Sequence, residues 1–251
     1  MSNHNGRFGQ LHCEKRSDWG DILKQAFHIR SRPDLPVYRP INNVAVMVRI
    51  AGLNGLDHRK LLEGSGLEIA DVQDPHKIIT TLQELHIERQ GIQLFPEPWI
   101  GLELGRHFHL GAKGKLGIAA MCCENGSEAL KLLITYIDLA STHFQYEIWT
   151  EGTVGYVRMR ELVGFQDIRR YIFEAEMASI HTMISLIMED STVFNKLHIA
   201  YPAPAYAERY REIFHCPVFF GAPHHMIVFN AELLFKPLKL ANPLAKKMLE
   251  Q

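Results

Sequence analysis

Apolar residues between positions 43 and 141 recur every three to four residues, the spacing that places side chains on one face of a helix. Three such stripes are present: Val44, Val46, Met47 and Ile50; then Ile78, Ile79, Leu82, Leu85 and His86; and finally Leu130, Leu133, Ile134, Ile137, Ala140 and Ser141. Gly52 ends the first stripe, and Ser127 is placed to cap the third. Between them, Asp57 is a good N-cap for a short helix that Gly64 and Gly66 stop. This part of the chain is therefore predicted to be helical.

The periodicity changes to two after residue 143, which is typical of strands. Outward and inward positions alternate over Phe144, Gln145, Tyr146, Glu147, Ile148 and Trp149. Glu151-Gly152 marks a turn, and Val154–Arg160 is predicted to return as the second strand of a hairpin. A long helix is predicted over Phe165–Glu189, with an inward face of Ile168, Tyr171, Ile172, Ala175, Ser179, Met183, Leu186 and Ile187. Three further short strands are predicted at Leu197–Tyr201, Pro217–Phe220 and Met226–Phe229.

Helices followed by the order ββ-α-β-α-ββ predict an α+β fold, in which a helical N-terminal lobe packs on a small antiparallel sheet. A helix covering one face of such a sheet buries the alternating apolar rows. Residues 1–40 differ from the rest, because they are polar and interrupted by glycine and proline. One short helix fits Asp18–His28, and the whole segment is predicted to be an arm or linker beside the main domain.

Composition narrows the function classes. The chain has 251 residues, of which 47% are hydrophobic, enough for a substantial core. Its formal net charge is -1, so no overall field favours nucleic acid or an anionic membrane. No apolar run approaches the length of about 18 residues that a membrane span requires. The four cysteines, Cys13, Cys122, Cys123 and Cys216, show no C-x-x-C spacing, and a reduced, cytoplasmic protein is expected.

The strongest candidate for a metal site is His107-Phe108-His109, because Gly101 precedes it at the spacing of a cupin motif. A cupin needs a glutamate a few residues later, whereas Lys113 and Gly114 stand there, and two histidines are too few for a zinc site. His224-His225 is expected in a solvated turn between two strands. No metal and no cofactor is predicted.

Catalytic motifs are equally weak. Gly64-Ser65-Gly66 lacks the G-x-S-x-G pattern of a nucleophile elbow, and Gly111–Lys115 lacks the spacing of a phosphate-binding loop. The sequence therefore predicts a protein that is not an enzyme. An enzyme that uses the thiol of Cys122 or Cys123 stays open as an alternative.

A small-molecule pocket is the remaining hypothesis, because such pockets combine apolar walls with a few polar groups. The long helices and the hairpin carry several apolar side chains with one polar end, and these are the candidate ligand-binding residues: Tyr136, His143, Tyr146, Tyr156, Arg158, Tyr171 and His181. Each is equally compatible with an ordinary core position. Arg158 shares a strand face with Tyr156 and would need an anionic partner if buried. This set mildly favours a hydrophobic acid, such as a fatty acid or an aromatic carboxylate, over a sugar.

The order of motifs resembles a known family. Between Tyr201 and Leu244, two prolines bracket a turn, aromatic and charged residues alternate at helical spacing, and two short apolar segments follow. Earlier landmarks are Gly55-Leu56-Asp57, Leu61-Leu62, Gly66-Leu67, Pro98–Gly105, Gly114–Gly117 and Ser127–Leu130. In this order they resemble the N-terminal effector domain, labelled arabinose-binding, of one branch of the AraC-type bacterial transcription regulators. The resemblance covers about Asn42–Leu249.

The resemblance implies a ligand-sensing and dimerisation domain over residues 41–240, which modulates DNA binding by a C-terminal helix-turn-helix domain. Residues 241–251 would begin the linker to that domain, which this chain does not contain. The expected partners are a small-molecule effector, a second copy of the chain, and promoter DNA through the missing domain only; no membrane partner is expected. A stand-alone small-molecule binding protein without transcriptional output is the alternative.

Overall fold

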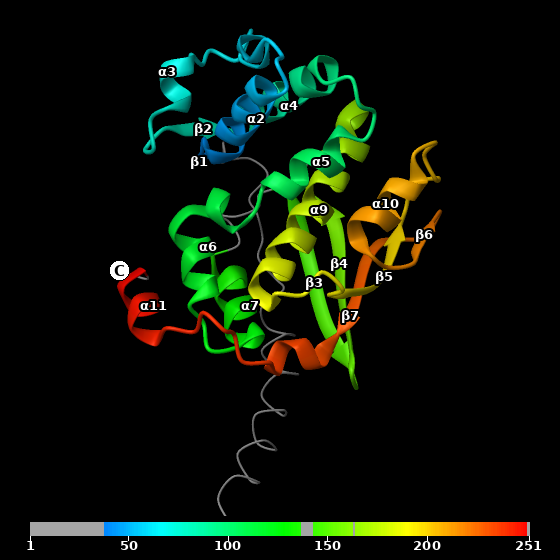
Figure 1. Ribbon diagram of the computed structural model, residues 1–251. Coiled ribbons are helices and arrows are strands. Elements are labelled where there is room, and N and C mark those ends of the chain that lie inside the picture. Colours follow the sequence, from blue (N-terminus) through cyan, green and yellow to red (C-terminus); the bar gives the residue numbers. More distant parts are fainter. Residues whose placement is uncertain (1–37, 137–142, 163, 250–251) are drawn as a thin grey trace, which may run out of the picture.

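Two lobes lie one above the other in Figure 1, a helical lobe and a larger lobe built on a sheet. The computed structural model describes residues 38–136, 143–162 and 164–249. The helix predicted over Asp18–His28 lies outside these residues. The helical lobe consists of β1 (Tyr38–Pro40), α2 (Asn42–Leu53), η1 (His58–Leu61), α3 (Ile69–Val72), β2 (Ile78–Thr80) and α4 (Thr81–Leu94).

A two-stranded ribbon begins the helical lobe. Strand β1, which comes from the end of the predicted arm, pairs antiparallel with β2, and Arg39 lies opposite Ile79. The predicted helical stripe is wrong at its start, because Ile78–Thr80 form β2 and the helix begins at Thr81. Adjacent β-branched isoleucines favour the extended backbone. Thr80 then caps α4, since its hydroxyl accepts a hydrogen bond from Gln83 N at 3.2 Å and the Gln83 side chain accepts one from Thr80 N at 3.0 Å.

The helix cap and the helix-ending glycines predicted between α2 and β2 are confirmed. The Asp57 carboxylate accepts a hydrogen bond from Arg59 N at 3.3 Å and caps η1. Gly64 and Gly66 both have positive φ, 76° and 73°, which glycine adopts without steric cost. These residues turn the chain from η1 toward α3.

Four helical segments lead into the larger lobe: α5 (Ile100–His107), η2 (Leu110–Lys113), α6 (Gly114–Met121) and α7 (Gly126–Thr135). Helix α7 begins one residue before the predicted cap, Ser127. The side chain of Asn125 accepts the hydrogen bond from Glu128 N at 3.0 Å that closes its first turn. The end of the predicted stripe, Ile137, Ala140 and Ser141, lies outside the described residues.

The predicted hairpin, long helix and three further strands are all present. The sheet contains β3 (Phe144–Glu151), β4 (Val154–Glu161), β7 (His225–Asn230), β5 (Phe194–Ile199) and β6 (Val218–Phe220), in that spatial order. Neighbours are antiparallel except β5 and β6, which are parallel because the chain crosses between them through α10 (Ala207–Phe214). The sheet is therefore mixed rather than purely antiparallel, and the α+β class is confirmed.

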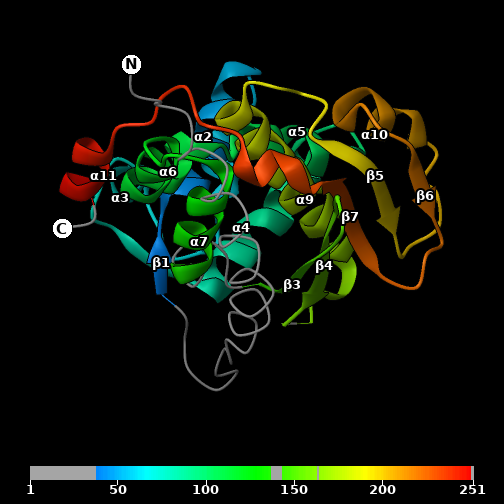
Figure 2. The same cartoon turned by 90° about the horizontal axis from the view of Figure 1, so that it is seen from below.

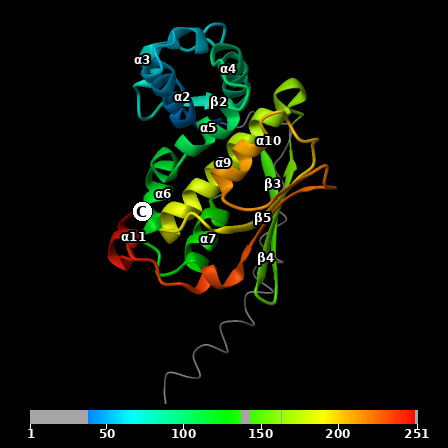
Figure 3. The same ribbon diagram turned by 45° about the vertical axis from the view of Figure 1, so that its right-hand side comes forward.

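Helix α9 (Arg169–Met188), which follows η3 (Gln166–Ile168), runs across one face of the sheet (Figure 3). Helices α6 and α7 lie on one side of it and α10 on the other (Figure 2). Helix α5 packs closely on α9 because two glycines face it: a Cβ on Gly105 would lie 2.3 Å from the Ala175 carbonyl oxygen, and one on Gly101 2.7 Å from that of Tyr171. The chain closes with η4 (Ala231–Phe235) and α11 (Pro243–Leu249).

The two histidines at the start of β7 have different environments. His224 is exposed, as expected of a solvated turn, but that prediction is wrong for His225. His225 is the first residue of β7, is buried, and stacks on Phe173 of α9 with ring centroids 3.8 Å apart. No local pattern predicts this, because the inward position depends on the residue at which the strand starts.

The structure bears on three hypotheses considered from the sequence: a metal site, a membrane span and a reactive cysteine. Within residues 38–136, 143–162 and 164–249, no three histidine, cysteine, aspartate or glutamate side chains are arranged to hold a metal ion. Among the same residues, no helix is both long and apolar enough to cross a membrane. Cys123 is fully buried and its thiol donates to the Ala119 carbonyl at 3.4 Å. Burial raises the pKa of the Cys216 thiol to about 11, which makes it a poor nucleophile.

Candidate functional site between the two lobes

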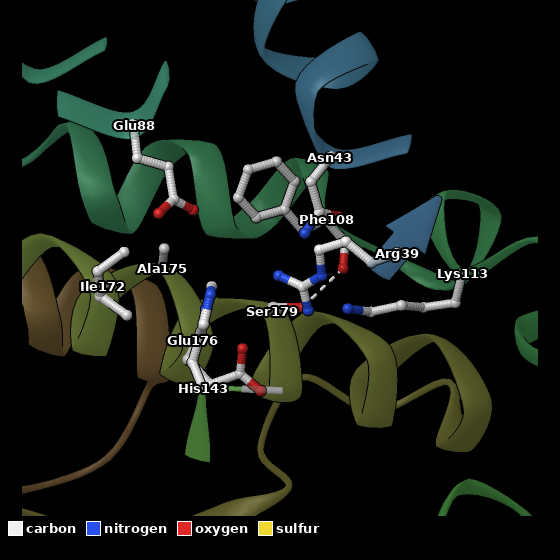
Figure 4. A pocket seen from close by; sticks show the side chains of 10 residues that line it. All are labelled: Arg39, Asn43, Glu88, Phe108, Lys113, His143, Ile172, Ala175, Glu176 and Ser179. Carbon is white, nitrogen blue, oxygen red and sulfur yellow. Dashed lines mark hydrogen bonds between the residues drawn. The ribbon is translucent and has the colours of Figure 1, made fainter. Parts of the chain in front are cut away.

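A small cavity lies where the helical lobe meets α9 and the residue that precedes β3 (Figure 4). It encloses about 20 Å³, which is room for about one water molecule. Half of its lining residues are ionisable: Arg39, Glu88, Lys113, His143 and Glu176. The apolar part of the wall is formed by Phe108, Ile172 and Ala175. This cavity is called the interlobe pocket below.

A buried ion pair forms one side of the pocket. Arg39 of β1 and Glu84 of α4 are both almost fully buried and are joined by a hydrogen bond between the guanidinium and the carboxylate. Asn43 donates a second hydrogen bond to Glu84 at 3.1 Å. Burial opposes ionisation of Glu84, but the charge of Arg39, the neighbouring His143 and the hydrogen bonds from Arg39 and Asn43 together outweigh it and lower the pKa of the carboxyl. The pair therefore stays charged and ties the ribbon to α4.

Glu88 lies one turn after Glu84 on α4, and its environment shifts the pKa of its carboxyl in the opposite direction. Its side chain is buried, and its Oε2 has no hydrogen-bond partner among the residues that the structure describes. Burial, reinforced by the negative charge of Glu84, raises the pKa of Glu88 well above its usual range. The neutral, protonated form therefore persists to a higher pH than in an exposed glutamate.

His143 is the second group with an unmet hydrogen bond. Its Nε2 is buried, makes no hydrogen bond within the described part of the chain, and lies 3.8 Å from the Glu84 carboxylate. Burial, together with the charge of Arg39, lowers the pKa of His143 to about 4. The imidazole is therefore neutral at pH 7, and Nε2 either donates or accepts according to the tautomer.

The opposite side of the pocket is held by Lys113 from η2 and Glu176 from α9. The phenol of Tyr146 on β3 donates a hydrogen bond to Glu176. Burial lowers the pKa of Lys113, while the carboxylate of Glu176 counteracts this. Figure 4 shows Glu88 entering from the α4 side, His143 and Glu176 from the opposite side, and the Lys113 ammonium directed inward.

A second buried cluster, called the tyrosine cluster, lies further along the chain. Glu174 of α9 is 1% exposed and accepts hydrogen bonds from the hydroxyls of Tyr206 and Tyr210 at 2.8 and 2.5 Å. The hydroxyls of Tyr201 and Tyr210 are 2.9 Å apart. Burial raises the pKa of Glu174 to about 7, against the effect of the two phenols. The cluster fastens α10 to α9 and has no orphaned polar atom within the described residues.

A separate apolar cavity of about 80 Å³ lies between α7, α9 and the sheet. Its walls carry only apolar atoms, from residues that include Leu130, Ile148, Ile184, Phe194 and Leu233. It offers space for hydrocarbon but no polar group that would orient a ligand.

Comparison with known proteins identifies the family. A model of the arabinose-binding domain of AraC transcription regulators, N-terminal, matches residues 55–238. The chain belongs to this family. The members that it resembles are transcription regulators rather than enzymes, as the sequence motifs predicted.

Individual relatives of this AraC-type domain are distant and longer. The ornithine utilization regulator of Pseudomonas aeruginosa is 23% identical over 212 residues, which are 84% of this chain and 62% of that protein. Two HTH-type transcriptional regulators, from Mycobacterium bovis and Mycobacterium tuberculosis, are 26% identical over 149 residues, 59% of this chain and 43% of theirs. The chain thus spans less than two thirds of the curated relatives it matches.

A solved structure supports the fold of the AraC-type domain. The crystal structure of the transcriptional regulator CdpR from Pseudomonas aeruginosa superposes with a TM-score of 0.57 and 19% sequence identity. The match covers 65% of this chain and 53% of CdpR. At this identity the likeness concerns the fold alone.

Three of the seven predicted ligand-binding residues lie in or beside the interlobe pocket. His143 lines it, and Tyr146 binds Glu176 in its wall. Tyr171 is buried on α9 next to the pocket-lining Ile172, and its hydroxyl lies 4.0 Å from the Met47 sulfur.

The other four predicted residues lie elsewhere. Tyr136 is 39% exposed, and Tyr156 stacks on Trp149 with ring centroids 5.0 Å apart. Arg158 is partly exposed rather than buried, and it forms an ion pair with Glu147 on the neighbouring strand. His181 lies 3.0 Å from the Ser191 carbonyl oxygen, in a surface hollow on the other side of α9.

Four charged residues that line the pocket were missed from the sequence, namely Arg39, Glu88, Lys113 and Glu176, and so was Glu84 beside it. Glu84 and Glu88 are spaced four apart on α4 and lie among its buried residues, a local signal that the stripe of apolar residues concealed. Arg39 and Lys113 gave no local signal, because each becomes a pocket residue only through the packing of distant elements.

Proposed function

We propose that this domain senses a small-molecule effector in the interlobe pocket and passes the signal to a helix-turn-helix DNA-binding domain in the complete regulator. The observation that carries this proposal is the placement of Glu88 and His143. Both are buried at the junction of the two lobes, and each has a polar atom with no partner within the described residues. Buried polar groups are nearly always hydrogen-bonded in folded proteins, so such orphans mark a site for another molecule.

The size of the pocket links binding to movement. A cavity of about 20 Å³ is too small for any organic effector. Binding therefore requires the helical lobe, which supplies Arg39 and Glu88, to shift relative to α9 and η2, which supply Glu176 and Lys113. An effector that prefers the shifted arrangement changes its population, and this differential binding is the only way a ligand moves such an equilibrium.

The ligand class proposed from the sequence was a hydrophobic carboxylic acid. In the pocket, Arg39 and Lys113 are the groups suited to a carboxylate, and Phe108 and Ile172 are suited to its carbon chain. The apolar cavity on the other part of α9 is a second place for hydrocarbon. We retain a carboxylic acid as the proposed class.

The remaining expectations on partners are proposals that rest on the family. We propose a homodimer, because several large apolar side chains on helices are exposed, including Leu53, Leu82 and Leu244. Contact with promoter DNA would be made by the helix-turn-helix domain, in the cytoplasm, and this chain alone is expected not to bind DNA specifically. Residues 41–240 are the proposed sensing domain, and residues 241–251 are the proposed start of the linker.

Mass spectrometry of the purified chain, first native and then denatured, tests the proposal after incubation with a bacterial small-molecule extract. The expected result is a dimer that releases a small molecule on denaturation, and a Lys113→Gln variant that retains much less of it. An exposed control, Lys239→Gln, should retain as much as the original chain. Retention that does not differ between Lys113→Gln and the control would exclude the interlobe pocket as the binding site.

A further inference from the structure

Glu88 is the pocket residue whose environment is least satisfied. Its side chain is 5% exposed, and its Oε2 lacks a hydrogen-bond partner among residues 38–136, 143–162 and 164–249. In Figure 4 the carboxyl group is directed into the pocket. Leaving a buried polar atom unpaired costs about 1–3 kcal/mol. A ligand group that pairs with Glu88 recovers this free energy, which makes the carboxyl a strong determinant of what binds.

The surrounding charges show which kind of group is missing. Arg39 is paired with Glu84, and the field of Glu176 acts on Lys113. The positive charges of Arg39 and Arg89 favour ionisation of Glu88, but these two arginines already pair with Glu84 and Asp167. The nearest carboxylates, Glu84 and Glu176, both oppose its ionisation. A cation brought by the ligand would meet three carboxyl groups.

Hydrogen-bond chemistry points the same way. An ammonium group carries three donors and no acceptor. Glu88 Oε2 accepts hydrogen bonds once the carboxyl is ionised, and neutral His143 accepts at Nε2 in the tautomer that is protonated at Nδ1. An ammonium group therefore has donors for both orphaned atoms. A carboxylate has only acceptors and satisfies neither of them in these states.

We propose that the effector carries a protonated amino group, which binds Glu88 as a carboxylate and donates to His143. This inference rests on the function proposed above and adds to it, because a carboxylate on the same molecule still faces Arg39 and Lys113. The effector is then an amino acid or a related amine rather than a simple fatty acid.

Binding of an amine by this route releases a proton from Glu88, whereas binding of a fatty acid does not. Before binding, the Glu88 carboxyl carries its proton. When the ligand ammonium takes that position, the proton leaves Glu88 for the solvent, and the ammonium keeps its own three. Binding therefore releases the proton that Glu88 holds in the free domain, and the number released per ligand follows the fraction of Glu88 that is protonated at the pH of the experiment.

Isothermal titration calorimetry of the domain, in two buffers with different ionisation enthalpies, measures both affinity and proton release. The probes are straight chains of three to six carbons in three matched series: ω-amino acids, 1-aminoalkanes and fatty acids. We expect at least one amine-bearing probe to bind with proton release and the fatty acid of equal length to bind at least about ten-fold more weakly.

Two variants, Glu88→Gln and Lys113→Gln, and one control complete the test. Glu88→Gln keeps the size of the side chain and should lose amine binding by at least about ten-fold, together with the proton release. Glu103→Gln, at an exposed ion pair with Arg106, should change neither. Thermal unfolding of each variant establishes that it is folded.

The outcomes separate the two proposals. If fatty acids bind as tightly as amines and only Lys113→Gln weakens them, the amine inference is overturned while the pocket stands. If no probe binds, or if neither variant changes binding, both the inference and the placement of the effector in this pocket are overturned.

Discussion

The tyrosine cluster and the interlobe pocket each bury a glutamate against a long helix, yet they are completed differently. Glu174 receives two tyrosine hydroxyls from the α10 region, and the cluster has no unmet polar atom within the described residues. Glu88 has an unpaired oxygen and faces two other carboxylates. A buried network that is fully satisfied stabilises one arrangement, whereas a half-satisfied one leaves room for a ligand to do so.

The position of each cluster agrees with this difference. The tyrosine cluster joins elements of one lobe, α9 and α10, which need to stay together. The interlobe pocket is assembled from two lobes, with Arg39 and Glu88 on one side and Glu176 and Lys113 on the other. The contrast teaches that burial of charge alone does not mark a binding site; unmet hydrogen bonds at a junction do.

The largest effect is expected from breaking the buried ion pair at the pocket, Arg39 with Glu84. Arg39→Ala leaves Glu84 buried without its cation, and it should lower the free energy of unfolding by about 3–5 kcal/mol. Urea denaturation measures this. Arg211→Ala removes an exposed pair with Glu208 and should change stability by less than about 1 kcal/mol. Equal losses in the two variants would show that the Arg39–Glu84 pair is not structural.

Within the tyrosine cluster, Tyr210→Phe should lower the free energy of unfolding by about 1.5–3 kcal/mol, because it removes a hydrogen bond to a carboxyl group. Tyr156→Phe is the matched control, since this ring is half-buried on the sheet and no hydrogen bond of its hydroxyl is part of the cluster. A loss confined to the control would contradict the cluster's stabilising role.

The pH dependence of stability sharpens the comparison further. The pKa of Glu174 is raised to about 7, so the folded state binds more protons than the unfolded state between about pH 4.5 and 7. Its contribution to stability is therefore present at the acidic end and falls as pH rises through that window. Glu88 has the same direction of shift. The midpoint of urea denaturation, measured from about pH 4.5 to 8, should depend less steeply on pH in Glu174→Gln than in the original chain.

His143 and His225 act in the opposite direction over an overlapping range. Burial lowers the pKa of both to about 4, so their contribution to stability is lost as pH falls from about 6.5 toward 4. Replacement of His225 by Phe should flatten that acid limb, since Phe keeps the stacking on Phe173 without a proton site. An unchanged acid limb would show that His225 is charged in the folded protein.

The sequence predicted those parts of the fold that local patterns determine. The hairpin follows from the alternation of Phe144, Tyr146 and Ile148, and α9 from its long periodic stripe. Local pattern misassigned Ile78–Thr80, because two isoleucines before a capping threonine fit either a helix or a strand. The parallel pairing of β5 with β6 is a long-range outcome of the crossover through α10, which no local signal encodes.

The candidate site was harder to predict than the fold. His143 was found because an apolar residue with a polar end is a reasonable pocket residue. Arg39 belonged to a segment that was taken for an arm, and Lys113 to a loop without a recognisable motif. Their roles depend on contacts between segments far apart in the sequence: Arg39 and Glu84 are 45 residues apart, and the hydrogen bond from Asn42 to Ala112 that joins α2 to η2 spans 70 residues.

The central claim is that Glu88 serves a ligand whereas Glu174 serves the fold, and matched alanine variants test it without any ligand. Urea denaturation at pH 7 compares Glu88→Ala with Glu174→Ala. The account predicts that Glu174→Ala loses about 2–5 kcal/mol, because it removes the carboxylate that accepts hydrogen bonds from Tyr206 and Tyr210, while Glu88→Ala loses less than about 1 kcal/mol. Equal and large losses would contradict it, because they would mean that Glu88 is a structural residue and that the pocket is part of the core.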